Sequence, residues 1–139
     1  MRKICISRDW LFNGNASVDL PHDYAIHTSR NPKAENGAHT GYFEAGMGKY
    51  VKYLSLVNTP QHYILDVDGA YMCTTVTLNE QQLIMHPHGY TPFLVDLTAI
   101  IISRRRNHVN IIFDYILFGI RCRAIFACIL IFKVFECEI

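Results

Sequence analysis

The segment His-Pro-His-Gly-Tyr-Thr-Pro-Phe-Leu-Val-Asp-Leu-Thr at residues 86–98 decides how the chain folds. Proline and glycine interrupt its first half, and Pro92 fixes the backbone in front of an apolar, β-prone run. The pattern predicts a turn followed by a strand. Upstream, Thr74–Leu78 is rich in β-branched residues and is followed by the polar pair Asn79-Glu80, so we expect another strand there.

Short apolar segments of the same kind recur through the first 112 residues. They lie at residues 10–12, 18–20, 50–55, 62–67 and 109–112. Several alternate with a period of two residues, turn signals separate them at intervals of roughly 8–12 residues, and no long segment has a helical period. Residues 25–39 are polar and loop-like. We therefore expect an all-β sandwich or barrel.

Four motifs, in this order, give the chain a family resemblance. They are Leu20-Pro21-His22-Asp23-Tyr24, Asp68-Gly69-Ala70-Tyr71, Val76-Thr77-Leu78-Asn79, and Gly89-Tyr90-Thr91-Pro92-Phe93 followed by Asp96-Leu97-Thr98. Together they resemble the N-terminal sugar-binding domain of family-two glycoside hydrolases, the β-galactosidases, β-mannosidases and β-glucuronidases. The resemblance implies a jelly-roll β-sandwich of the galactose-binding-domain type, most like that of a β-galactosidase.

The matches to this family stop near residue 112. Residues 113–139 contain no Ser, Thr, Asn, Gln, Pro or His, and they hold three of the five cysteines. We therefore divide the chain into a sugar-binding-like sandwich at residues 1–112 and an atypical apolar tail at residues 113–139.

Three interpretations of this tail stay open. A membrane helix is the least favoured, because Asp114, Arg121 and Arg123 each cost about 2.5–3.5 kcal/mol near the bilayer centre. Residues 125–134 are apolar and β-branched enough to supply replacement strands, and an out-of-frame ending is compatible with that. We expect the tail to pack, since residues 124–132 would aggregate if exposed.

Glycoside hydrolysis needs two carboxylates across the scissile bond, about 5–5.5 Å apart in retaining enzymes. Asp66 and Asp68 have the spacing of one strand face, but we interpret them as a solvated face and a turn residue. The resemblance places both catalytic glutamates of the family on a separate barrel later in the chain. It therefore implies no catalytic residue here, and we expect no hydrolase activity from this chain alone.

Sugar binding uses aromatic rings against C–H surfaces, with amides and carboxylates for hydroxyl groups. The candidates of these types are Asp23, Tyr42, Phe43, Tyr71, Asn79 and Tyr90. The competing interpretation is that the aromatic residues among them belong to the core.

Other ligand classes have weaker support. His86 and His88 are separated by a proline with no third ligand at a telling spacing, so we expect no metal and no cofactor. Arg104, Arg105 and Arg106 form a solvated turn in a chain of net charge +1, which argues against nucleic acid. We interpret Cys73 as a buried strand residue.

The cysteine count and the first residues bear on the compartment. Five cysteines without a CxxC pair, and an apolar run of only three residues near the start, predict a cytoplasmic protein with reduced thiols. We expect a non-catalytic, carbohydrate-binding-like fragment of a family-two glycosidase. The alternative is an interaction module that self-associates or pairs with a separately encoded catalytic chain.

Overall fold

A computed structural model describes residues 2–34, 37–44, 46–55, 61–71, 73–101, 107–114 and 132–138. The strands in these parts are β1 (Arg2–Cys5), β2 (Trp10–Phe12), β3 (Ala16–Val18), β4 (Met47–Leu54), β5 (Gln61–Val67), β6 (Thr74–Leu78), β7 (Gln81–His86), β8 (Phe93–Asp96), β9 (Asn107–Asp114) and β10 (Phe132–Glu138). The helical elements described are three short 3₁₀ turns, η1 (Tyr24–His27), η2 (Gly37–Thr40) and η3 (Thr98–Ile100).

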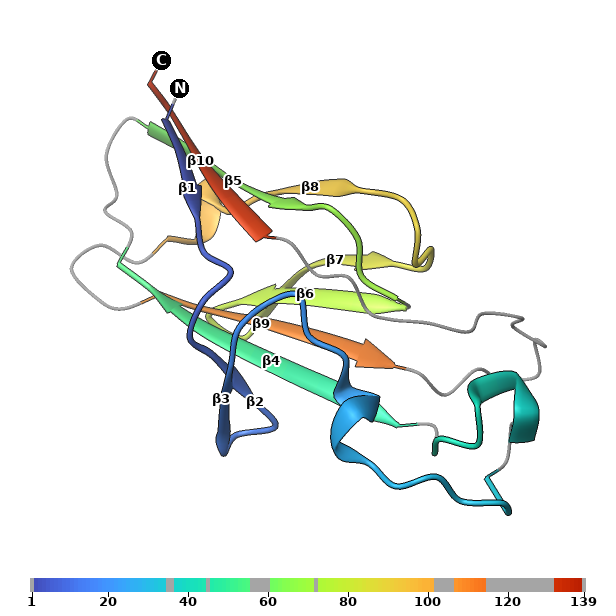
Figure 1. Ribbon diagram of the computed structural model, residues 1–139. Helices are drawn as coiled ribbons and strands as arrows, with labels where there is room; N and C mark the ends of the chain where they lie inside the picture. Colours follow the sequence, from blue (N-terminus) through green and yellow to red (C-terminus); the bar gives the residue numbers. More distant parts are fainter. Residues whose placement is uncertain are drawn as a thin grey trace.

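The strands form two antiparallel sheets. Sheet A has the order β1-β10-β5-β8, and sheet B has the order β3-β2-β4-β9-β6-β7. Figure 1 shows the two sheets as separate layers, with sheet A above sheet B. The predicted all-β sandwich is confirmed.

The core lies between the sheets because alternate residues of each strand point inward. In β5 the buried residues are Tyr63, Leu65 and Val67, and β6 contributes Val76 and Leu78 from the opposite sheet. Both sets belong to one hydrophobic cluster. The two-residue alternation in the sequence therefore determines which side chains of each strand enter the core.

Trp10 anchors this cluster near the first turn of sheet B. Its side chain is fully buried, and its indole Nε1 donates a hydrogen bond to the carbonyl oxygen of Ile6 at 2.6 Å. A buried indole needs such an acceptor, so the link between β1 and β2 is fixed by the same residue that fills the core.

The tail contributes a strand to sheet A. β10 lies between β1 and β5, with Val134 paired to Ile4 on one side and to Leu65 on the other. Most of the segment expected to supply strands, residues 125–131, and most of the proposed membrane span lie outside the described residues. In the described part of the chain, no helix is long and apolar enough to span a bilayer.

Asn79 and Glu80, the polar pair at which the predicted strand ends, form the turn between β6 and β7. Both residues have positive φ, 50° and 70°, as a tight two-residue hairpin of type I′ requires. The Asn79 amide donates to the Ile100 carbonyl at 3.1 Å and to Asn107 Oδ1 at 2.9 Å. Asn79 therefore ties this hairpin to β9 and to η3.

Candidate functional site

Two of the six predicted sugar-binding residues have structural roles. Asp23 caps η1, where its Oδ1 accepts a hydrogen bond from the Ala25 N–H at 2.9 Å. Asn79 holds the β6–β7 turn against its neighbours, as described above. Both side chains therefore have hydrogen-bond partners within the chain.

Tyr71 and Tyr90 do come together. Their ring centroids are 5.3 Å apart, with Tyr71 buried and Tyr90 71% exposed. The neighbouring Gly89 leaves room for the Tyr71 ring, because a Cβ at that position would stand 2.0 Å from Tyr71 Cδ2. The pair thus consists of one core ring and one surface ring beside the β7–β8 connection.

Tyr42 and Phe43 lie in the segment after η2. Tyr42 is exposed and has a positive φ of 66°. The Arg30 guanidinium carbon is 5.5 Å from the centroid of the Phe43 ring, within the range of a cation–π contact. That ring face is therefore at least partly covered by the chain's own arginine.

The six candidates do not form one site. Asn79 precedes β7 and Tyr90 follows it, and a six-residue strand separates its ends by roughly 20 Å at about 3.3 Å per residue. The sequence supplied suitable residue types, but the strand order keeps them apart.

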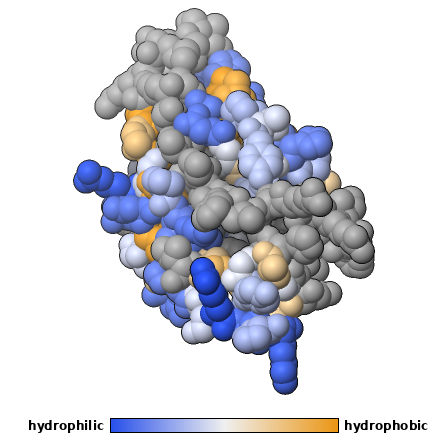
Figure 2. Space-filling model, turned by 45° about the vertical axis from the view of Figure 1, so that its right-hand side comes forward, coloured by the Kyte–Doolittle hydropathy of each residue, from blue (hydrophilic) through white to orange (hydrophobic). Residues whose placement is uncertain are grey.

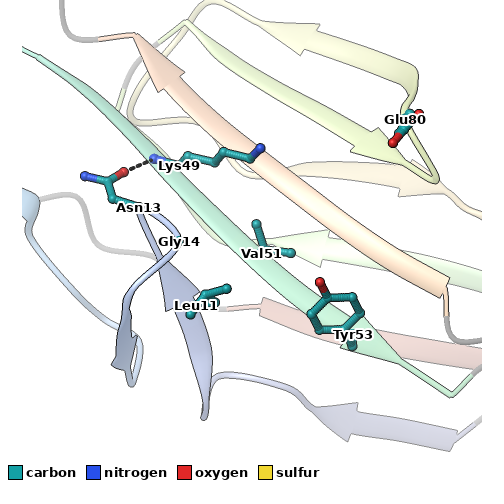
Figure 3. Close-up of a pocket in the computed structure, with 7 residues that line it drawn as sticks. All are labelled: Leu11, Asn13, Gly14, Lys49, Val51, Tyr53 and Glu80. Carbon is teal, nitrogen blue, oxygen red and sulfur yellow. Dashed lines mark hydrogen bonds between the residues drawn. The ribbon is translucent and has the colours of Figure 1, made fainter.

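A groove on the outer face of sheet B brings together a different set of residues. It has a volume of about 610 Å³. Its lining residues, drawn in Figure 3, are Leu11, Asn13, Gly14, Lys49, Val51, Tyr53 and Glu80. None of the six predicted residues lines it.

Strand β4 supplies the middle of this groove. Lys49, Val51 and Tyr53 lie two residues apart, so they share the face of β4 that points away from the core. Leu11 lies beside Val51 because the two are paired between β2 and β4. Tyr53 is 59% exposed, so much of its side chain is accessible from solvent.

The two ends of the groove are polar. At one end, Asn13 and Lys49 are joined by two hydrogen bonds, from the Asn13 N–H to the Lys49 carbonyl (2.8 Å) and from the Lys49 N–H to Asn13 Oδ1 (2.9 Å). At the other end Glu80 comes from the β6–β7 turn, across β9 from Tyr53 (Figure 3). Apolar and aromatic surface thus lies between an ammonium group and a carboxylate.

The alternation of residues 49–53 could have indicated that Lys49, Val51 and Tyr53 share one face of a strand. Which residues from other parts of the chain lie beside them depends on the order of the strands in the sheet. Leu11, Asn13 and Glu80 reach the groove through the β2-β4-β9-β6 neighbourhood. A single sequence does not specify that order.

His86 and Cys73, for which the sequence predicted no ligand role, do not line the groove. His86 stacks on Phe93 with centroids 4.3 Å apart, and its Nε2 lies 2.8 Å from Thr91 Oγ1. Cys73 is half-buried in front of β6 and not inside a strand, which corrects our interpretation. Across the described ranges, no group of three or more His, Cys, Asp and Glu side chains is placed to hold a metal ion.

Comparison with curated proteins reveals the family likeness. No family model matches the chain. However, it is 34% identical over 83 residues to the β-galactosidase BoGH2A of Bacteroides ovatus, a match that covers 58% of this chain. The chain resembles part of a family-two glycoside hydrolase. The predicted family resemblance is confirmed.

Solved structures of family-two glycoside hydrolases share this fold. A family member from Bacteroides cellulosilyticus matches 99% of this chain with a TM-score of 0.87 at 20% identity. The β-glucuronidase of Bacteroides uniformis matches 96% with a TM-score of 0.74 at 18% identity.

The chain corresponds to a small part of these relatives. It spans 10% of the Bacteroides ovatus β-galactosidase, and 21% and 18% of the two solved chains. The family likeness is therefore that of one β-sandwich region within a much longer enzyme.

Proposed function

We propose that this chain is the N-terminal carbohydrate-binding-like domain of a family-two glycoside hydrolase of the β-galactosidase kind, acting in carbohydrate metabolism. The observation that carries the proposal is the 34% identity to a β-galactosidase over 83 residues. The sandwich fold shared with family-two enzymes supports it.

In this proposal the domain carries no catalytic step. Cleavage of a glycoside requires a pair of carboxylates set across the bond. The resemblance assigns those groups to a separate barrel, so the domain's role is to support that barrel and to contact carbohydrate.

A chimeric enzyme tests the domain assignment. The matching region of the Bacteroides ovatus β-galactosidase is replaced by the corresponding part of this chain, and hydrolysis of p-nitrophenyl β-galactoside is measured. We expect the chimera to keep at least about a tenth of the parent's kcat/KM, whereas a control chimera with an unrelated β-sandwich loses activity. A folded chimera no more active than the control would contradict the assignment.

A second candidate role is association with another chain. Met47 and Met85 are exposed large apolar residues on the outer face of sheet B, toward the end of that face where Lys49 lies. Exposed apolar groups of this kind favour a protein contact when they are contiguous. Light scattering tests this role, because a strict monomer at high concentration would contradict self-association.

A further inference from the structure

We propose that the groove on the outer face of sheet B binds a short, neutral oligosaccharide, with Tyr53 beneath a sugar ring and Lys49 and Glu80 at its two ends. This proposal rests on the proposed function, and it locates carbohydrate contact at residues other than the six predicted from sequence.

The size and lining of the groove suit a small ligand. About 610 Å³ lies within the 300–1,000 Å³ typical of small-molecule sites. Leu11 and the exposed Tyr53 ring offer apolar surface for the C–H face of a pyranose, and the buried Val51 lies between them on β4. An aromatic ring also has few rotatable bonds, so it loses little conformational entropy when a ligand packs on it.

The polar groups match hydroxyl chemistry. The Lys49 ammonium only donates hydrogen bonds, and the Glu80 carboxylate only accepts them. A hydroxyl group does both, so a chain of hydroxyls can be bound at either end. The formal charges of the two residues cancel, which favours a neutral sugar over a uronate or a phosphate.

The position of the groove argues against an extended peptide. Peptides that add to a sheet use the unpaired backbone of an edge strand. β4 lies inside sheet B, hydrogen-bonded to β2 on one side and to β9 on the other. The backbone groups of β4 are therefore already paired, and only its side chains are available to a ligand on this face.

The backbone conformation of Glu80 allows its role in the groove to be tested. A glutamate at φ 70° is in the left-handed region, where glycine is relaxed and other residues are strained. The turn therefore keeps a carboxylate at the groove at some cost in stability. A substitution that relieves this strain should stabilise the fold while it removes the ligand contact.

NMR titration of the full chain with lactose, galactotriose and mannotriose tests the proposal, with glucuronate as the charged comparison. We expect shifts of amides in β4 and in the β2–β3 and β6–β7 turns, and weaker binding of glucuronate. Tyr53→Ala should weaken binding at least tenfold. Glu80→Gly should weaken it severalfold while raising the unfolding temperature, so a folding defect cannot explain the loss.

Matched variants separate the alternatives. Glu80→Gln keeps the backbone strain and removes the charge, and it should also weaken binding. Tyr90→Ala removes an exposed tyrosine elsewhere and should leave binding unchanged. If Tyr90→Ala abolishes binding and Tyr53→Ala does not, the groove is the wrong site, although carbohydrate contact by the domain stands.

Two further results would overturn the groove assignment. One is the absence of shifts with every neutral sugar at tens of millimolar, which leaves the domain assignment to be decided by the chimera. The other is a dimer by light scattering that Tyr53→Ala converts to a monomer, because the groove would then be occupied by a second copy of the chain.

Discussion

Gly89 has no side chain, and this leaves space for the Tyr71 ring to pack against its backbone. Alanine at this position would place its Cβ 2.0 Å from Tyr71 Cδ2, well inside contact distance. We expect Gly89→Ala to destabilise the protein by about 1–3 kcal/mol, the usual cost of overpacking. Chemical denaturation measures it.

Gly14 provides the control for that substitution. It has a φ of 82°, and a Cβ there would meet nothing within 4 Å. Gly14→Ala therefore reports backbone strain without a clash, and it should cost about 1 kcal/mol. If both variants lose the same free energy of unfolding, the contact with Tyr71 does not constrain position 89.

At Glu80, in contrast to Gly89 and Gly14, we expect a substitution to stabilise the protein. Because its φ is 70°, Glu80→Gly relieves strain, partly offset by the greater freedom of glycine in the unfolded chain. We expect a gain of about 0.5–1 kcal/mol, measured by urea denaturation. An equally large gain in Glu80→Gln, which keeps the strain, would show that charge is responsible.

The sequence could predict which residue types a sugar-binding site uses, but not which of these residues lie close together. The strand at Thr74–Leu78 and its end at Asn79-Glu80 were predicted from residue type, and β6 has these bounds. The role of Asn79 as a tie to Asn107 was not predicted, because it depends on a contact between residues 28 positions apart.

At the scale of elements, η1 is attached to sheet B through a histidine cluster. His22 is buried, and its Nδ1 lies 2.7 Å from the Tyr50 hydroxyl of β4. Its Nε2 lies 3.1 Å from Nε2 of His27, the last residue of η1. One proton between the two imidazoles satisfies this second contact, whereas a proton on each facing nitrogen would cause repulsion.

Stability should therefore fall in mild acid. Burial lowers the pKa of His22 below 6.5, the nearby His27 lowers it further, and Asp23 opposes them. The fold thus favours neutral His22, so its contribution is present above pH 6.5 and is lost as the pH falls through the lower folded-state pKa. Thermal unfolding measured between about pH 7.5 and 5 checks this.

His22→Gln is the matched variant for this experiment. It should be less stable near neutral pH, with a flatter dependence of unfolding temperature on pH. A variant with the same slope as the parent would assign the acid sensitivity to other groups.

Elements were predicted unevenly from sequence. β4, β5 and β6 have clear alternation or β-branched residues, and the structure contains them near the predicted places. β7 and β1 were not expected from their residues, because Gln-Gln-Leu-Ile-Met-His and Arg-Lys-Ile-Cys do not alternate cleanly. Both become strands through pairing with a neighbour, which is a tertiary effect.

At the scale of the whole molecule, sheet A depends on β10. This strand is paired along seven residues with β5 and along four with β1. We expect removal of residues 132–139 to abolish cooperative thermal unfolding, as followed by circular dichroism, because two strands lose their central partner. Removal of Ile139 alone is the control and should have little effect. A truncated chain that melts like the parent would make β10 dispensable.

The surface of the molecule is mixed in character. On the face in Figure 2, the hydrophobic residues among those described are scattered between hydrophilic ones. The two-residue alternation and the spacing of turn signals could predict a sandwich. They could not predict where on the surface apolar and polar groups would meet, because that depends on which strands become neighbours.

The pairing of β1 with β10 also bears on how the protein folds during synthesis. Arg2 lies opposite Glu136, and Figure 1 shows the two ends of the chain side by side. On the ribosome, Arg2 must wait until Glu136, 134 positions later, has been made before β1 and β10 can pair. Sheet B between β2 and β9 can pair earlier, so sheet A is the late step. Until then the apolar inner face of β5 depends on chaperones or on sheet B for cover.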